Sequence, residues 1–160
     1  RAATGYQLHM EDIDLPAYIK QLREQIDALC QTKKIGLQVE IEHLPAVLSA
    51  DKLLLERAIM NVVNNALDYS PQDSSISISM MGDNGSLKIS VTDAGPGFSQ
   101  EDLLHAEEQF YMADRSRSSN LHFGMGLFIT KSIVQQHGGQ LILSNSEKTG
   151  GAQVTISIPY

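Results

Sequence analysis

Apolar and polar residues follow two periods along the chain, and these predict three main helices and a set of short strands. Helical spacing of apolar positions predicts helices over residues 15–33, 52–69 and 124–137. Asp14 and Pro16 mark the start of the first helix, and Gly138-Gly139 follow the last. Alternating apolar and polar residues predict strands at 6–10, 37–41, 47–48, 76–81, 87–92, 140–144 and 152–158.

Neither period holds from Ala94 to His122, where glycine, proline, serine and charged residues dominate. One short helix is expected there, around residues 101–109. Long irregular segments inside a compact domain are usually functional or disordered. Together, the elements predict an α+β fold, a two-layer sandwich of about three main helices on a mixed, mostly antiparallel sheet of about five strands.

Composition and charge narrow the classes of function. The 160 residues carry 12 Lys and Arg against 19 Asp and Glu, a net charge of −7, which argues against an electrostatic nucleic-acid binder. A single cysteine, Cys30, excludes an internal disulfide and a cysteine-based zinc site, and it favours a reducing, cytoplasmic environment. No apolar run reaches the roughly 18–20 residues of a membrane span.

A polar stripe runs along the second predicted helix. Asn61, Asn65 and Asp68 stand at i, i+4 and i+7, so their side chains project from one face. Asparagine is an indifferent helix former, and a solvated face is the plain alternative. Amide oxygens suit magnesium, which prefers oxygen ligands and keeps waters beside substrate phosphates. We therefore favour a functional role for this stripe.

Two glycine segments flank the irregular region. Asp93, at the end of a strand, is followed by Gly95 and Gly97, which places a carboxylate beside a tight turn that a flat ligand could approach. Gly124 and Gly126 open the last helix, where backbone N–H groups can converge on an anion. Each pattern alone also fits an ordinary turn or a chance occurrence, and the order of the motifs is the stronger signal.

These motifs together resemble the ATP-binding catalytic domain of sensor histidine kinases, within the superfamily that includes gyrase, Hsp90 and MutL ATPases. The resemblance implies the Bergerat fold. Four ordered segments carry it and resemble the N box, the first glycine box, the F box and the second glycine box: residues 61–71, 93–97, 110–117 and 124–131, the last running on to 137–139.

The resemblance implies a role for each matching residue. Asn65 is the expected magnesium ligand, and Asp93 is expected to hold the adenine amino group. Asn61 stands where hydrolytic relatives carry a glutamate base, and an amide cannot take a proton from water, so transfer is favoured over hydrolysis. Asn61, Asn65 and Arg115 are the expected catalytic residues. Besides Asn65 and Asp93, contacts to ATP are expected from Asn61, Tyr69, Gly95, Gly97, Phe110, Arg115, Arg117, Gly124, Gly126 and Leu127. Residues 94–123 would form the ATP lid.

Two departures from the family pattern stand out. Asp68 replaces the lysine of many members, which exchanges a phosphate contact for a negative charge. We expect weaker ATP affinity, or compensation by Arg115 or Arg117. Leu121 and His122 stand where the second glycine box usually has another glycine.

The same resemblance implies the domain plan and the partners. Residues 1–14 would be a leader from a dimerising hairpin that bears the phosphoaccepting histidine, and 15–160 the ATP-binding domain. The full-length protein would be a homodimer, whereas this fragment by itself would be a monomer. A response regulator would be a further partner. The domain would be the cytoplasmic part of a membrane-anchored sensor. A stand-alone serine kinase of the anti-sigma type and a degenerate, non-catalytic nucleotide-binding module are the alternatives.

Overall fold

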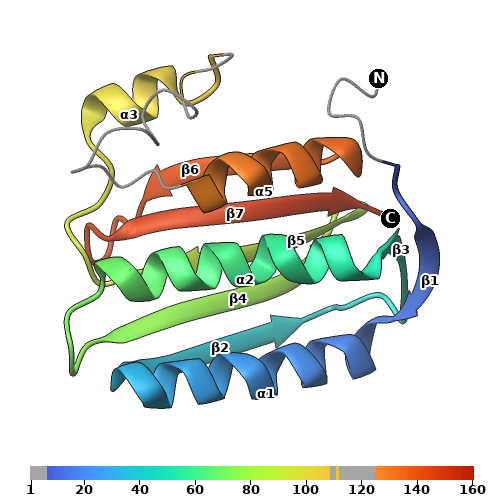
Figure 1. Ribbon diagram of the computed structural model, residues 1–160, viewed down its shortest axis with the longest axis horizontal. Coiled ribbons are helices and arrows are strands. Elements are labelled where there is room, and N and C mark those ends of the chain that lie inside the picture. Colours follow the sequence, from blue (N-terminus) through green and yellow to red (C-terminus); the bar gives the residue numbers. More distant parts are fainter. Residues whose placement is uncertain (1–6, 109–110, 112–124) are drawn as a thin grey trace.

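Five strands form one mixed sheet, and three long helices cover one of its faces (Figure 1). The computed structural model describes residues 7–108, 111 and 125–160. The strand order is β2-β4-β5-β7-β6; β2 and β4 run parallel, and the other neighbours run antiparallel. The strands are β2 (Gly36–Glu42), β4 (Ser75–Asp83), β5 (Ser86–Thr92), β6 (Gln140–Asn145) and β7 (Ala152–Pro159).

The three long helices lie side by side across the sheet in the order α1, α2, α5 (Figure 1). The long helices are α1 (Leu15–Lys33), α2 (Lys52–Tyr69) and α5 (Met125–Gln136), and the short α3 (Gln100–His105) lies beyond one end of the sheet. This confirms the predicted two-layer α+β sandwich. The predicted short helix at 101–109 begins one residue earlier and ends at His105 within the described part of the chain.

One predicted strand is wrong in its position. Residues 7–9 are not extended into a strand, and β1 instead covers Met10–Asp14. It pairs antiparallel with β3 (Val47–Asp51), with Met10 opposite Asp51 and Asp14 opposite Val47. The sequence pattern places this strand too early in the chain, because the strand is defined by its pairing with β3 and not by burial of one face. The last five residues of the expected leader therefore lie in this two-stranded ribbon.

The ends of the elements follow the expected local chemistry. The Asp14 carboxylate accepts a hydrogen bond from the N–H of Ala17 at 3.3 Å and caps α1. At the other end, Lys34 takes a left-handed conformation (φ 59°) and its N–H bonds back to the last turn. Asn84 and Gly85 both have positive φ in the turn between β4 and β5, as a two-residue hairpin requires.

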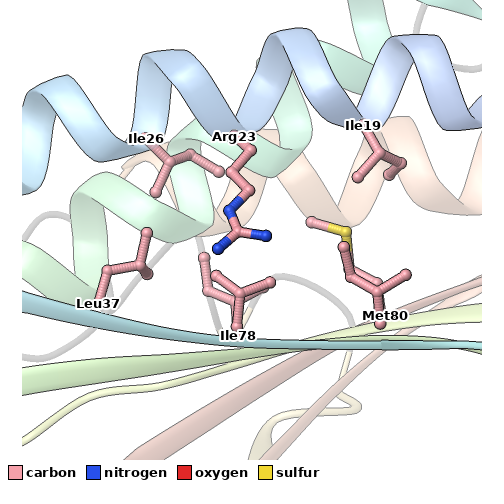
Figure 2. A pocket seen from close by; sticks show the side chains of 8 residues that line it. Ile19, Arg23, Ile26, Leu37, Ile78 and Met80 are labelled. Carbon is pink, nitrogen blue, oxygen red and sulfur yellow. The ribbon is translucent and has the colours of Figure 1, made fainter.

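A small apolar pocket lies between α1 and the edge of the sheet (Figure 2). Arg23 lies over it with its guanidinium directed at the sheet, between Ile19 and Ile26 of the same helix. The floor is formed by side chains of β2 and β4, among them Ile78 and Met80. Its eight lining residues include no residue of the predicted nucleotide site, so we assign the pocket to packing at the sheet edge.

Asp51 joins three elements at the end of the molecule where the chain enters. Its side chain accepts hydrogen bonds from the N–H of His9 at 2.8 Å and of Leu54 at 3.1 Å, the second of which caps α2. Burial alone would raise the pKa of Asp51, but these two bonds and the nearby His137 and His9 outweigh it and lower the pKa. The N–H of Asp51 donates in turn to Nε2 of buried His137 at 3.0 Å. That imidazole also bonds through Nδ1 to the carbonyl of Ile133.

Replacing His137 by alanine should destabilise the domain by about 2–4 kcal/mol, because it leaves the buried N–H of Asp51 without its acceptor and opens a cavity. Urea denaturation measures this loss. His9→Ala is the matched control, since His9 bonds to Asp51 through its backbone N–H, and it should stay within about 0.5 kcal/mol of the parent. Equal stability of the two variants would contradict the role given to the imidazole.

Candidate functional site

The side chains of the polar stripe on α2 contact two different helices, α5 and α1. The Asn61 amide donates a long hydrogen bond, 3.4 Å, to the carbonyl of Gly126 in the first turn of α5. Asn65, one turn further on, is half-buried. Asp68 is exposed and forms an ion pair with Lys33 of α1 at 3.5 Å. Such a pair in solvent contributes little stability, so the stripe combines a positioned amide with an acidic residue at the surface.

Asp93 holds the end of β5 against the start of β7. It is buried, with 3% of its surface exposed. One carboxylate oxygen accepts hydrogen bonds from the N–H of Gly95 and of Ala152, both at 2.9 Å. The N–H of Asp93 donates to the carbonyl of Ala152 at 2.9 Å. The orientation of the carboxylate is therefore fixed by the backbone on both sides of it.

The glycines of this turn let backbone segments of the protein pack against one another. A Cβ at Gly95 would stand 2.5 Å from the carbonyl oxygen of Tyr69. Gly97 has φ +86°, and a Cβ there would overlap the carbonyl oxygen of Gly150. A Cβ at Gly151 would overlap the carbonyl oxygen of Asp93 itself. The sequence suggests that the glycines leave room for a ligand. The structure gives a further reason, because a side chain at these positions would collide with a backbone carbonyl.

Tyr69 lies where α2, the Asp93 turn and α3 converge. It is half-buried, and its pKa is raised by burial and then by the negative charges of Asp68, Asp102 and Asp93. The phenol therefore stays protonated throughout the physiological range. The contact of Tyr69 with a bound base stays a prediction.

The second glycine motif differs from the first. Gly126 has room for a Cβ, which would meet the side chain of Asn61 at an ordinary 3.5 Å among the described atoms. The Leu127 side chain is fully buried in the core, so any contact it makes to a ligand would come from its backbone. Phe110, Arg115, Arg117 and Gly124, and with them Leu121 and His122, lie outside the described residues.

Several hydrogen bonds that tie the site together had no signal of their own in the sequence, although Ser70 and Lys131 lie within the motif segments 61–71 and 124–131. The Ser70 hydroxyl accepts from the N–H of Ala94 at 3.0 Å. Asn145 bonds both backbone groups of Phe98, and the Lys131 ammonium donates to the carbonyl of Ala106 at 3.0 Å. These bonds join residues 24 to 47 positions apart, which no local pattern reveals.

Buried Asp102 is an exception, because its surroundings do have a sequence signature. Ser99 caps α3 by accepting from the N–H of Asp102 at 3.0 Å, and a serine followed by an acid three residues later is a known helix-start pattern. The Asp102 carboxylate itself accepts from the hydroxyl of Tyr111 at 2.9 Å. The pattern predicts the start of α3, but it does not predict the hydrogen bond between Asp102 and Tyr111, which lie nine positions apart.

The side chains of Asn65 and Asp93 are chemically suited to a magnesium nucleotide. A half-buried amide on α2 is an oxygen ligand that magnesium accepts, and a fixed carboxylate is an acceptor for an exocyclic amine. In residues 7–108, 111 and 125–160 no three His, Cys, Asp or Glu side chains gather as a metal site. Within those same residues, no helix is long and apolar enough to cross a bilayer.

Comparison with known sequences places this site in a family. Residues 50–160 match the model of the histidine kinase-, DNA gyrase B- and HSP90-like ATPases. The chain is 37% identical over 152 residues to the sensor histidine kinase SpaK of Bacillus subtilis, covering 95% of this chain and 33% of SpaK. It is 34% identical over 136 residues to the probable sensor protein PcoS of Escherichia coli, covering 84% and 28%. The chain thus spans about a third of the length of these relatives.

Solved structures agree on the fold. The catalytic domain of the histidine kinase ThkA superposes with a TM-score of 0.78 at 20% identity, over 95% of this chain and 97% of that one. The mycobacterial sensor histidine kinase MprB gives a TM-score of 0.73 at 26% identity, over 94% and 97%. The family model covers residues 50–160, the relatives are sensor kinases and the fold is shared. The chain therefore belongs to the family of histidine kinase-, DNA gyrase B- and HSP90-like ATPases.

Proposed function

We propose that this domain binds magnesium-ATP and passes the γ-phosphoryl group to a histidine on a dimerising hairpin outside this chain, as part of a two-component sensor kinase. The observation that carries the proposal is the buried Asp93 carboxylate, oriented by the N–H groups of Gly95 and Ala152 beside Tyr69. A fixed acceptor in a buried turn suits a flat base with an exocyclic amine. Family membership supports the nucleotide as the ligand.

Asn61 supports transfer in preference to hydrolysis. Its amide has no proton-accepting group of useful basicity, so it cannot activate a water as a carboxylate would. Its bond to the Gly126 carbonyl holds it at the junction of α2 and α5. Asn65 would hold magnesium, which when bound would neutralise charge on the phosphates. The domain then acts by positioning the phosphates and excluding water.

The remaining parts of the proposal concern residues and partners outside the described site. Arg115 or Arg117 would reach the phosphates, Phe110 would line the nucleotide site, and 94–123 would form the lid. Residues 1–14 would lead from the hairpin into the domain at 15–160. ThkA has been solved in complex with a response regulator protein, TrrA, and we propose a response regulator as a partner here as well. The parent protein would be a membrane-anchored homodimer with this domain in the cytoplasm.

Asp93→Asn should raise the Kd for ATP at least about tenfold, because an amide presents a donor where the exocyclic amine needs an acceptor. Asn65→Ala should abolish the strengthening of ATP binding by magnesium. Isothermal titration with and without magnesium measures both. Asn64→Ala, an exposed neighbour on the same helix, should bind as the parent does. Full ATP affinity in the Asp93→Asn, Asn65→Ala double variant would overturn the proposed site.

Asp68→Asn should lower the Kd for ATP about threefold at low salt, because it removes a negative charge from the helix that carries Asn65. The effect should shrink as salt is added. Glu56→Gln removes the same charge from the other half of α2, where Glu56 bonds to Gln25, and it should leave the Kd unchanged. Identical affinities for the two variants would show that Asp68 lies too far from the phosphates to act.

The reaction itself is tested with radiolabelled ATP, magnesium and the upstream hairpin supplied in trans or fused to this domain. We expect label on the hairpin that is lost in acid and survives alkali, which identifies phosphohistidine. Acid-stable label would support the alternative serine kinase. ATP binding with no label from the fused protein would support the alternative of a non-catalytic nucleotide-binding module.

A further inference from the structure

We infer that Asn145 and Lys131 are positioning residues that clamp the two ends of residues 98–106 to the core and so hold that segment in place for nucleotide binding. This inference rests on the proposed function, since it assigns these two side chains a part in ATP affinity. Asn145 lies outside the glycine and asparagine motifs. Lys131 is the last residue of segment 124–131, but the resemblance gives it no role.

Asn145 clamps the first end. It is the last residue of β6, and its side chain accepts from the N–H of Phe98 at 2.8 Å and donates to the carbonyl of Phe98 at 3.0 Å. One amide thus satisfies both backbone groups of a residue 47 positions away, in the manner of a strand neighbour. A Cβ on the preceding Gly97 would stand only 2.9 Å from the Asn145 amide oxygen, so the clamp and the glycine turn are packed together.

Lys131 clamps the second end. Its ammonium reaches from the middle of α5 to the carbonyl of Ala106, the residue that ends α3, at 3.0 Å. A charged donor strengthens this bond, and the carbonyl end of a helix attracts positive charge. Asn61 bonds Gly126 in the first turn of the same helix. α5 therefore contacts both the asparagine of the site and the far end of α3.

The segment between the clamps depends on them. α3 has only six residues, too few to be stable without tertiary contacts. Within residues 98–106, the side chains of Phe98, Asp102 and Ala106 are buried, whereas Leu104 is 77% exposed. The segment continues directly from the turn of Gly95 and Gly97, and Gly97 packs against Asn145, so a shift of the segment also disturbs the turn that follows Asp93. The two clamps therefore add to the core packing of Phe98, Leu103 and Ala106 in holding this segment beside the Asp93 turn.

The test compares Asn145→Asp, Lys131→Met and the double variant, with Lys131→Arg as the conservative replacement. Each single change should raise the Kd for ATP about tenfold, and the double change clearly less than a hundredfold, because one released end already frees the segment. Lys131→Arg should restore most of the affinity. Lys88→Met is the control for loss of a lysine side chain, since Lys88 of β5 pairs instead with Asp83 of β4 at 3.4 Å, and it should leave the Kd unchanged.

Hydrogen exchange separates positioning from a loss of fold. The amides of Asp102 and Leu103, both bonded to Ser99, should exchange faster in the clamp variants, whereas those of Gly95 and Ala152 should keep their protection. If Asn145→Asp fails to fold, Lys131→Met and Lys131→Arg carry the test alone. Unchanged ATP affinity in Lys131→Met, with α3 exchanging faster, would overturn the inference and leave the proposed function standing. A parent protein that binds no ATP would overturn both.

Discussion

The packing of backbone against backbone around Asp93 is the constraint on which the rest of the site depends. One carboxylate oxygen takes the N–H groups of Gly95 and Ala152, and side chains are absent where Gly95 and Gly151 meet neighbouring carbonyls. This closes the end of β5 onto the start of β7 and onto the end of α2. Because every contact involves main-chain atoms, the turn has little freedom, and the carboxylate is oriented before any ligand arrives.

The two ends of the helical layer are held by different means. At the end where the chain enters, buried groups of Asp51 and His137 join β1, α2 and α5. At the other end, the segment around α3 packs on the core through Phe98, Leu103 and Ala106, and the side chains of Asn145 and Lys131 bond to its backbone. The bonds at both ends join residues far apart in the sequence, so each end depends on the packing of the whole domain.

The chemistry of single residues was more predictable than their contacts. Helical periodicity identified α2 and its polar stripe, but the stripe does not act as one surface: Asn61 bonds to Gly126, whereas Asp68 pairs with Lys33. The glycines after Asp93 were interpreted as space for a ligand, and the structure adds carbonyls of Tyr69 and Gly150 as their first neighbours. The strand expected at residues 6–10 begins at Met10 because its partner β3, and not its own pattern, defines it.

The sequence alone determined the family and most of the elements, because these depend on periodicity and on motifs that are local in the chain. The spacing of apolar residues is enough to predict α1, α2 and the β4–β5 hairpin. The order of the asparagine and glycine motifs is enough to indicate an ATP-binding domain. Tertiary structure decided which side chains hold the site together. Asn145 on Phe98, Lys131 on Ala106 and Asp51 on His137 each join residues at least 25 positions apart, and such pairs form only once the sheet and helices have brought distant segments side by side.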